Sequence, residues 1–185
     1  MWARIKPVWH GAKVAAPAVP VRCTAGDNLA IHVAVARAPR GSVLVADVGD
    51  VTDRGYWGEV LTTGAEARGI AGLVIDGGVR DTAALAAHGF PVFSAAVALR
   101  GATKQHPGTV GLPALVGGVL VALGDWIVGD SDGVTVVPGG AVEAVLDAGR
   151  AREQKESVMF EKLRAGQTTV ELLGLDAGPV EVADL

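Results

Sequence analysis

The stretch IAGLVIDGGVRD, residues 70–81, decides the fold of this chain. Its first half, residues 70–75, is a short uncharged apolar run, which is typical of a strand buried on both faces of a parallel sheet. Its second half, Asp76-Gly77-Gly78-Val79-Arg80-Asp81, is predicted to be the turn that leaves this strand. Arg80 and Asp81 then place a guanidinium and a carboxylate side by side where a buried strand meets solvent. That pairing predicts a site for an anion and a metal.

Helix and strand patterns alternate on either side of this strand. An earlier carboxylate, Glu59, follows Gly58 at the predicted start of a helix, and twenty residues separate it from Arg80. The pattern predicts helices at residues 27–37, 58–68 and 82–88, strands at residues 42–48, 71–75 and 91–95, and a polar loop at residues 49–56. Such alternation is the signature of a βαβ core. Glu59, Arg80 and Asp81 should therefore converge at one sheet edge.

The segments outside this core have other patterns. Residues 13–23 alternate loosely but carry prolines, which predicts an edge strand or an extended arm. Residues 110–121 and 126–137 look like β segments, and the Asp132-Gly133 pair in the second is a strong hairpin-turn signal. Residues 140–165 begin with helical periodicity and become heavily charged. We expect this helix to pack on another surface, such as a neighbouring subunit.

Length and composition favour one α/β domain. The 185 residues correspond to a single domain, residues 1–185, that can bury a substantial core without disulfides. Half of the residues are apolar but only 4% are aromatic, so the core must consist mainly of Ala, Val, Leu and Ile. That composition favours parallel strands with closely packed helices. The 26 glycines have no fixed repeat, which indicates many tight turns.

Charge and hydropathy argue against several classes of partner. The formal net charge is −4 and the basic residues form no stripe, so nucleic acid is not an expected ligand. The longest oily stretch, residues 112–123, is too short to span a bilayer, and prolines and charges interrupt any signal peptide. The single cysteine, Cys23, is predicted to be a buried inert thiol, which fits a reducing compartment. We therefore expect a cytoplasmic protein without a membrane partner.

The charged clusters each have an alternative structural interpretation. Asp81 could cap the N-terminus of the helix at residues 82–88, leaving Arg80 solvated. The Asp130-Ser131-Asp132-Gly133 run lacks the closing Glu of a calcium loop, so a hairpin turn is favoured. Lys104 could form a Schiff base, but nothing around it implies desolvation, and a solvated loop is favoured. The four histidines show no paired metal spacing, so a metal in this chain should be bound by oxygen.

An ordered set of short motifs runs along the chain: Gly58-Glu59-Val60-Leu61, Asp76-Gly77-Gly78-Val79-Arg80-Asp81, Gly89-Phe90-Pro91-Val92-Phe93, Pro107-Gly108, Gly117-Gly118, Gly124-Asp125 and Asp130-Ser131-Asp132-Gly133-Val134. Together these motifs resemble the 4-hydroxy-4-methyl-2-oxoglutarate aldolase family, which also includes the regulator of ribonuclease activity A. The resemblance covers roughly residues 5–175. The order of the set is far more specific than any one motif.

This resemblance implies a fold and an activity. The family fold is a compact α/β sandwich of swivelling-domain (β/β/α) type, assembled as homotrimers or homohexamers with sites between subunits. Its aldolases are class II enzymes that use Mg²⁺ or Mn²⁺. They cleave 4-hydroxy-2-oxo acids to pyruvate and an oxo compound, and they often decarboxylate oxaloacetate as well. The resemblance therefore implies a metal-dependent pyruvate aldolase that acts on a small 2-oxo acid.

The family motif is an acidic residue, twenty residues and then Arg-Asp, which here are Glu59, Arg80 and Asp81. By resemblance, Asp81 binds the metal directly, and Glu59 binds it through water. Arg80 clamps the pyruvyl oxygen and stabilises the enolate. The substrate carboxylate is received by the backbone amides of Gly58, Glu59, Val60 and Leu61, in keeping with the anion affinity of a helix start.

Two features of the resemblance bear on the activity. The family usually has Asp where this chain has Glu59, which should alter turnover or substrate preference. The alternative function is that of a non-catalytic regulator that binds a ribonuclease or an RNA helicase. The aldolase branch supplies a third carboxylate from the C-terminal helix of a neighbouring subunit, and Glu156 lies at the matching place, with Glu153 and Glu161 as nearby competitors. A carboxylate at Glu156, acting on the metal through water, favours the enzyme.

Overall fold

The computed structural model describes residues 1–183, and its contacts divide the chain into two compact units, Met1–Gly140 and Ala141–Leu185. The first unit contains the sheet and three helices. The second contains the long charged helix predicted near the C-terminus. The sequence predicted a single domain over residues 1–185, and the two units are described separately below.

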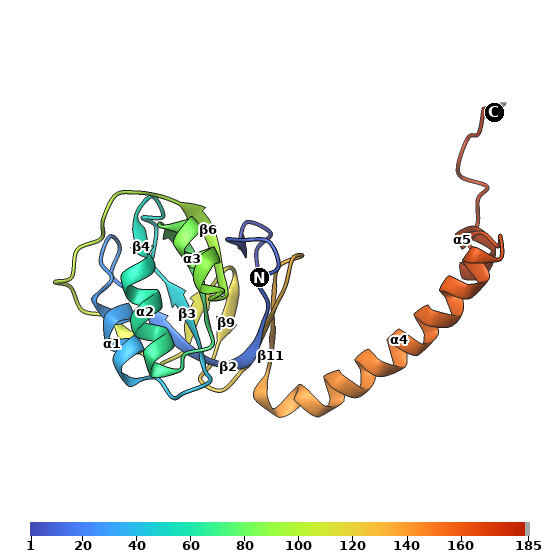
Figure 1. Ribbon diagram of the computed structural model, residues 1–185. Coiled ribbons are helices and arrows are strands. Elements are labelled where there is room, and N and C mark those ends of the chain that lie inside the picture. The colour runs from blue at the N-terminus through green and yellow to red at the C-terminus, as the bar shows by residue number, and fades with distance from the viewer. Residues whose placement is uncertain (184–185) are drawn as a thin grey trace. The chain divides into compact units, whose positions relative to one another are not determined.

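The first unit is built on a mixed sheet that has nine strands within the described residues (Figure 1). Its main path runs β1-β6-β5-β3-β2-β10-β11, while β4 pairs with β5 and β7 pairs with β2. The four central strands β2, β3, β5 and β6 are parallel. The strands are β1 (Lys6–Pro7), β2 (Val14–Arg22), β3 (Val43–Asp47), β4 (Gly55–Trp57), β5 (Gly72–Val79), β6 (Val92–Val97), β7 (Thr109–Val110), β10 (Trp126–Gly129) and β11 (Val134–Val137).

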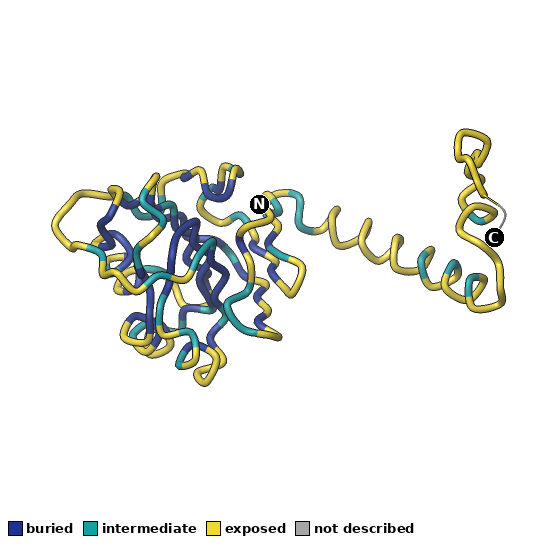
Figure 2. Tube along the Cα trace, turned by 90° about the horizontal axis from the view of Figure 1, so that it is seen from above, coloured by how far each residue is buried: buried dark blue, intermediate teal, exposed yellow. Residues whose placement is uncertain are grey.

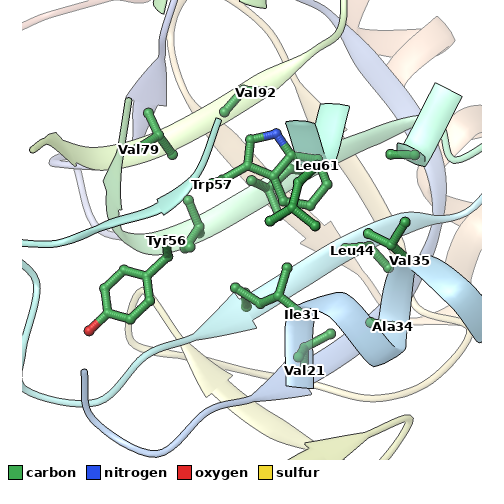
Figure 3. Packing of buried hydrophobic residues seen from close by; sticks show 14 of the residues in the cluster. Val21, Ile31, Ala34, Val35, Leu44, Tyr56, Trp57, Leu61, Val79 and Val92 are labelled. Atoms are coloured by element: carbon green, nitrogen blue, oxygen red, sulfur yellow. The ribbon is translucent and has the colours of Figure 1, made fainter. Parts of the chain in front are cut away.

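Three helices cover one face of this sheet: α1 (Leu29–Arg37), α2 (Glu59–Arg68) and α3 (Thr82–His88) (Figure 1). Leu44 and Ala46 of β3 point into the core beneath the helices. In Figure 3, Ile31 and Val35 of α1 and Leu61 of α2 pack together with Leu44. Trp57, which is 1% exposed, stacks on Phe90 with the ring centroids 5.9 Å apart.

The other face of the sheet carries a second core. Val43 and Val45 alternate with Leu44 and Ala46 along β3, so they point to the opposite side. They pack with the hairpin of β8 (Ala114–Val116) and β9 (Val119–Val121) and with residues from β10 and β11. Helices therefore lie on one side of the central sheet and β structure lies on the other. The α/β sandwich of swivelling-domain (β/β/α) type is confirmed.

The prediction that residues 13–23 form an edge strand or an arm is wrong, because β2 lies inside the sheet between β3 and β10. Its prolines occur where the ladders begin. The Pro20 carbonyl accepts from Gly111 on the β7 side, so the missing N–H of Pro20 faces that side, where pairing starts only at Val21. Pro17 faces β3, where pairing starts at Ala18. A central strand can therefore contain both prolines without losing a ladder bond.

Strand β5 extends beyond its predicted end at residue 75 and includes Asp76 to Val79. The predicted polar loop contains the short strand β4, which pairs with Gly78 and Val79 on one side while β6 pairs with them on the other. An added Cβ at Gly78 would lie 2.6 Å from the Arg54 carbonyl oxygen. The glycine therefore permits the close approach that continues the strand, and the turn begins only at Arg80.

The second unit contains α4 (Val142–Arg164), preceded by a short 3₁₀ turn, and α5 (Thr169–Leu173), which Thr168 and Glu171 start with a capping box. None of the α4 side chains is buried, as the colours along this helix show (Figure 2). Packing of an apolar face normally supplies most of the stability of a helix. The packing of α4 on a neighbouring subunit stays a prediction. No helix among residues 1–183 is long and apolar enough to cross a membrane.

Three structural interpretations from the sequence are confirmed. Cys23 is 7% exposed, and burial, with smaller contributions from nearby carboxylates, raises the pKa of its thiol to about 12, so the thiol stays protonated. The Asp130 to Gly133 run is a turn between the antiparallel strands β10 and β11, where the Asp130 amide donates to the Gly133 carbonyl at 3.0 Å. Lys104 lies exposed in a loop.

Asp27, which the sequence did not single out, fixes the loop that follows β6. Its Oδ2 accepts from the Thr103 hydroxyl at 2.8 Å and from the Gln105 and His106 amides at 2.6 and 3.1 Å. Its Oδ1 accepts from the Leu29 amide at 2.8 Å. Burial opposes ionisation, but these hydrogen bonds outweigh it and lower the pKa of Asp27 to about 2. The ionised carboxylate therefore ties this loop to the start of α1.

Replacement of Asp27 by Asn should destabilise the protein by about 1–3 kcal/mol, because an amide cannot accept all of these bonds. A carboxyl group with a lowered pKa stabilises the fold fully above its unfolded pKa near 4. That contribution is lost as pH falls through the folded value of about 2. Urea unfolding from pH 7 to pH 2 should show the gap between wild type and Asp27→Asn closing at the acid end. Asp176→Asn, an exposed carboxylate that also accepts an amide, is the control; a gap independent of pH would contradict the assignment.

Candidate functional site

The predicted Arg-Asp pair lies where β5 ends and α3 begins. The Arg80 amide donates to the Trp57 carbonyl at 2.9 Å, which continues the pairing of β5 with β4. Asp81 is the N-cap residue of α3, but its side chain makes no capping bond. Its Oδ2 instead accepts from the amide of Glu59 at 3.1 Å. The carboxylate therefore faces the start of α2, not that of its own helix.

The backbone of Asp81 explains this direction. With φ at 57° and ψ at 36° it is left-handed, and it is the one non-glycine residue with positive φ among residues 1–183. This conformation costs a non-glycine residue about 1–2 kcal/mol, although Asp tolerates it better than most. Such strained residues cluster at functional sites. The strain favours a functional role for Asp81 over the helix-cap interpretation.

Gly58 provides the space that Asp81 needs. It is the N-cap of α2, and a Cβ at this position would lie 2.4 Å from Oδ2 of Asp81 and 3.0 Å from Cγ of Arg80. The amides of Glu59, Val60 and Leu61 belong to the first turn, because the first helical bond runs from Thr62 to Gly58. Asp81 already uses the first of these three amides. The amides of Val60 and Leu61 remain available to a ligand at the electropositive end of α2.

The Arg80 side chain lies beside this helix start. Its Nε is 3.6 Å from Oδ2 of Asp81, and Nη1 is 3.5 Å from the Gly55 carbonyl oxygen. The two charged side chains are 39% and 42% exposed. A guanidinium has five N–H donors, and these contacts leave part of the group free for a ligand. Gly55 was not predicted, and a Cβ there would lie 3.2 Å from Cβ and Cδ of Arg80.

The Glu59 side chain turns toward α3 at the same edge. Its Oε1 is 3.7 Å from Nε2 of His88, and Nδ1 of His88 is 2.8 Å from Oε2 of Glu66. No role was predicted for His88 from the sequence, because the four histidines have no paired metal spacing. The seven-residue interval between Glu59 and Glu66 places both carboxylates on one face of α2, and that interval was the available signal.

The structure thus brings Gly58 and the first-turn backbone of Glu59, Val60 and Leu61 together with the side chains of Arg80 and Asp81, while the Glu59 carboxylate contacts His88. Glu156, the remaining predicted residue, belongs to the second unit. It lies on α4, where its Oε1 accepts from Nε of Arg152 at 2.7 Å. The side chain of Glu156 is 42% exposed. The proposed role of Glu156 in a neighbouring subunit stays a prediction.

The oxygen donors at this edge suit one kind of metal. No group of three or more His, Cys, Asp or Glu side chains among residues 1–183 forms a cluster that could enclose an ion. Asp81 offers one carboxylate, and its Oδ1 accepts no hydrogen bond from any described residue. One exposed carboxylate fits a hard ion such as Mg²⁺, which keeps several waters. It does not fit zinc, which needs three or four protein ligands that are mainly His nitrogen or Cys sulfur.

Comparison with known proteins gives the family. A family model described as Aldolase/RraA matches residues 2–136, which is more than half of the chain. The chain belongs to the aldolase/RraA family. A relative from Halalkalibacterium halodurans, provisionally named 4-hydroxy-4-methyl-2-oxoglutarate aldolase, is 40% identical over 150 residues, covering 80% of this chain and 71% of the relative. The resemblance found in the sequence is confirmed.

Solved structures of this family have the same fold. An uncharacterised protein from Pseudomonas syringae pv. tomato superposes with a TM-score of 0.81 at 30% identity, covering 89% of this chain and 77% of that one. A protein from Thermus thermophilus described as the RNA-processing inhibitor RraA superposes with a TM-score of 0.68 at 28% identity, covering 75% and 84%. The aldolase/RraA family thus includes proteins named for catalysis and proteins named for inhibition.

Gly58→Ala should displace Asp81, because the new Cβ would meet a carboxylate oxygen at 2.4 Å. We expect a crystal structure of the variant to show Asp81 moved and its bond to the Glu59 amide broken, with the fold retained. Gly64→Ala in the same helix is the matched control, because its Cβ would meet only Val35, at 3.7 Å. That control should be neutral or up to about 1 kcal/mol more stable. An unmoved Asp81 in Gly58→Ala would show that glycine is not required here.

Proposed function

We propose that this protein is a class II pyruvate aldolase that requires Mg²⁺ or Mn²⁺. The observation that carries the proposal is the strained left-handed backbone of Asp81, which directs a carboxylate away from its own helix and toward the start of α2 beside Arg80. The substrate would be a 4-hydroxy-2-oxo acid, cleaved to pyruvate and a second oxo compound. Oxaloacetate decarboxylation would be a side activity, because it generates the same pyruvate enolate.

Asp81 would bind the metal directly through its free Oδ1, and Glu59 would contribute through a water. Glu156 from a neighbouring subunit would also contribute through a water. A bound divalent ion supplies a Lewis acid that polarises the 2-oxo group and spreads the negative charge of the enolate. The Glu59 amide bonds to Oδ2 of Asp81 and leaves Oδ1 available for the ion.

The remaining groups would act on the substrate itself. The free amides of Val60 and Leu61 would bind its carboxylate, since helix starts favour anions. Cleavage breaks the bond between carbons 3 and 4 and leaves its electron pair on the pyruvate half, while a water at the site takes the proton of the C4 hydroxyl as the second carbonyl forms and can later return a proton to carbon 3. Arg80 would hydrogen-bond the enolate oxygen that gains this charge. Protonation of carbon 3 then yields pyruvate.

The alternative is a non-catalytic regulator that binds a ribonuclease or an RNA helicase. The RraA name of one structural relative, described as an RNA-processing inhibitor, favours this reading. The two readings differ in what they require of Arg80 and Asp81. A metal-dependent lyase needs both side chains for the reaction itself, whereas a regulator needs neither of them for catalysis.

Pyruvate release from oxaloacetate and from a panel of 4-hydroxy-2-oxo acids should require a divalent ion and stop on addition of EDTA. Arg80→Ala should lower kcat/KM by about 100-fold or more, as removal of one electrostatic donor does. Asp81→Ala should abolish the response to metal. Arg37→Ala, an exposed arginine at the end of α1, should match wild type, and circular dichroism should show all three variants folded.

Three results would contradict this assignment. Turnover that survives EDTA and is trapped by borohydride would move the chemistry to a Schiff base, with Lys104 as the candidate. Absence of turnover on every substrate, together with binding to a ribonuclease, would favour the regulator. Loss of the folded circular dichroism spectrum in Asp81→Ala would show that Asp81 has only a structural role.

The site should be completed between subunits. Glu156→Ala and Asp81→Ala proteins, each inactive alone, should recover part of their activity when dissociated and reassembled together, because some interfaces would pair an intact Asp81 with an intact Glu156. Native mass spectrometry would verify the mixed oligomers. Glu153→Ala, which lies three residues earlier on α4, is the control and should stay active. Mixed oligomers without recovered turnover would show that Glu156 does not act across an interface.

A further inference from the structure

His88 lies between two carboxylates of α2. Its Nδ1 is 2.8 Å from Oε2 of Glu66, and its Nε2 is 3.7 Å from Oε1 of Glu59. The two glutamates are two helical turns apart on one face of α2, and His88 is the last residue of α3. The side chain of His88 is 26% exposed, against 57% for Glu59. The His88 ring thus contacts Glu59 in the first turn of α2 and Glu66 in its last turn.

The short contact with Glu66 anchors the ring, and the longer contact is with Glu59, whose amide bonds to Asp81. Glu66 engages Nδ1 at hydrogen-bond distance, which fixes the orientation of the imidazole. Nε2 is then directed at the carboxylate of Glu59. This arrangement parallels the way in which a carboxylate orients a histidine at metal sites, where loss of the outer partner costs about 10- to 100-fold in affinity or activity.

The contact with His88 depends on residue 59 being a glutamate and not an aspartate. A glutamate in the first turn of a helix has one more rotatable bond than an aspartate, so more freedom must be lost before it can act through a water. An aspartate at this position would withdraw the carboxylate by about one C–C bond, roughly 1.5 Å, and away from His88. The longer side chain is therefore the one that reaches the histidine.

We propose that His88 is a positioning residue that holds the carboxylate of Glu59 in place for the reaction at Asp81. The kinetic part of this inference rests on the proposed aldolase function. The contact itself does not, because Glu59, Glu66 and His88 meet in the chain without any ligand. His88 is thus the partner that lets a glutamate serve at position 59.

A double-mutant cycle between His88 and Glu59 tests the proposal. His88→Ala should lower kcat for oxaloacetate with Mg²⁺ by about 10-fold, with a smaller change in KM, and should weaken Mn²⁺ binding measured by electron paramagnetic resonance. In a Glu59→Gln background, His88→Ala should have little further effect on either quantity. His88→Gln, which can place an amide nitrogen near Glu59, should restore part of kcat. His10→Ala, an exposed histidine near the N-terminus, is the control.

The outcomes separate this inference from the proposed function. An equal loss in wild-type and Glu59→Gln backgrounds, or an unchanged kcat in His88→Ala, would overturn the positioning role. A wild-type protein without turnover on any substrate would overturn the aldolase proposal. In that case, urea unfolding of wild type, His88→Ala, Glu59→Gln and the double variant, all without metal, tests whether His88 and Glu59 interact. A midpoint coupling between Glu59 and His88 would support it, and strictly additive midpoints would overturn it.

Discussion

The continuation of β5 through Gly77 and Gly78 is the constraint on which the site depends. A Cβ at Gly77 would lie 2.5 Å from a methyl group of Val48, and one at Gly78 would lie 2.6 Å from the Arg54 carbonyl oxygen. Only with glycine at both positions can β4 pack against the end of β5 while β6 pairs on the other side. Arg80 and Asp81 are thereby delivered to the start of α2. A side chain at either glycine would force these neighbours to shift.

The core explains why α2 begins where it does. Trp57, the residue before the N-cap Gly58, is buried and stacks on Phe90, and its indole nitrogen donates to the Thr62 hydroxyl at 2.7 Å. The carbonyl of Trp57 accepts from the Arg80 amide. One buried aromatic residue therefore fixes both the first turn of α2 and the position of Arg80. The start of α2 and the end of β5 are consequently held beside each other.

The sequence predicted the parts of this arrangement that depend on local pattern. Helices α2 and α3 lie within one residue of their predicted bounds, because Gly58, Gly69 and Gly89 mark their ends. The place of β2 inside the sheet was missed, because which side of the strand each proline faces depends on partners distant in sequence. The strand β4 was missed because three residues carry no period.

The candidate site was predicted less completely than the fold. The Arg-Asp pair and Glu59 follow from a motif, and their proximity follows from parallel strands that end at one edge. The left-handed conformation of Asp81 and the ring of His88 between two glutamates could not be predicted. The first is a single dihedral choice, and the second depends on how α2 packs against α3. The spacing of Glu59 and Glu66 puts both carboxylates on one face of α2, but it does not say that a histidine of α3 packs between them.

The energies at Asp81 show how the strained geometry can persist. The left-handed backbone costs about 1–2 kcal/mol, whereas a hydrogen bond to an ionised group contributes about 1.5–3 kcal/mol. The contribution of this hydrogen bond lies toward the lower end of that range, because the Asp81 side chain is 42% exposed and partly screened by water. The bond from the Glu59 amide therefore offsets the strain without a large surplus. A group balanced in this way can bind a cation through its free oxygen while its own position costs the fold little.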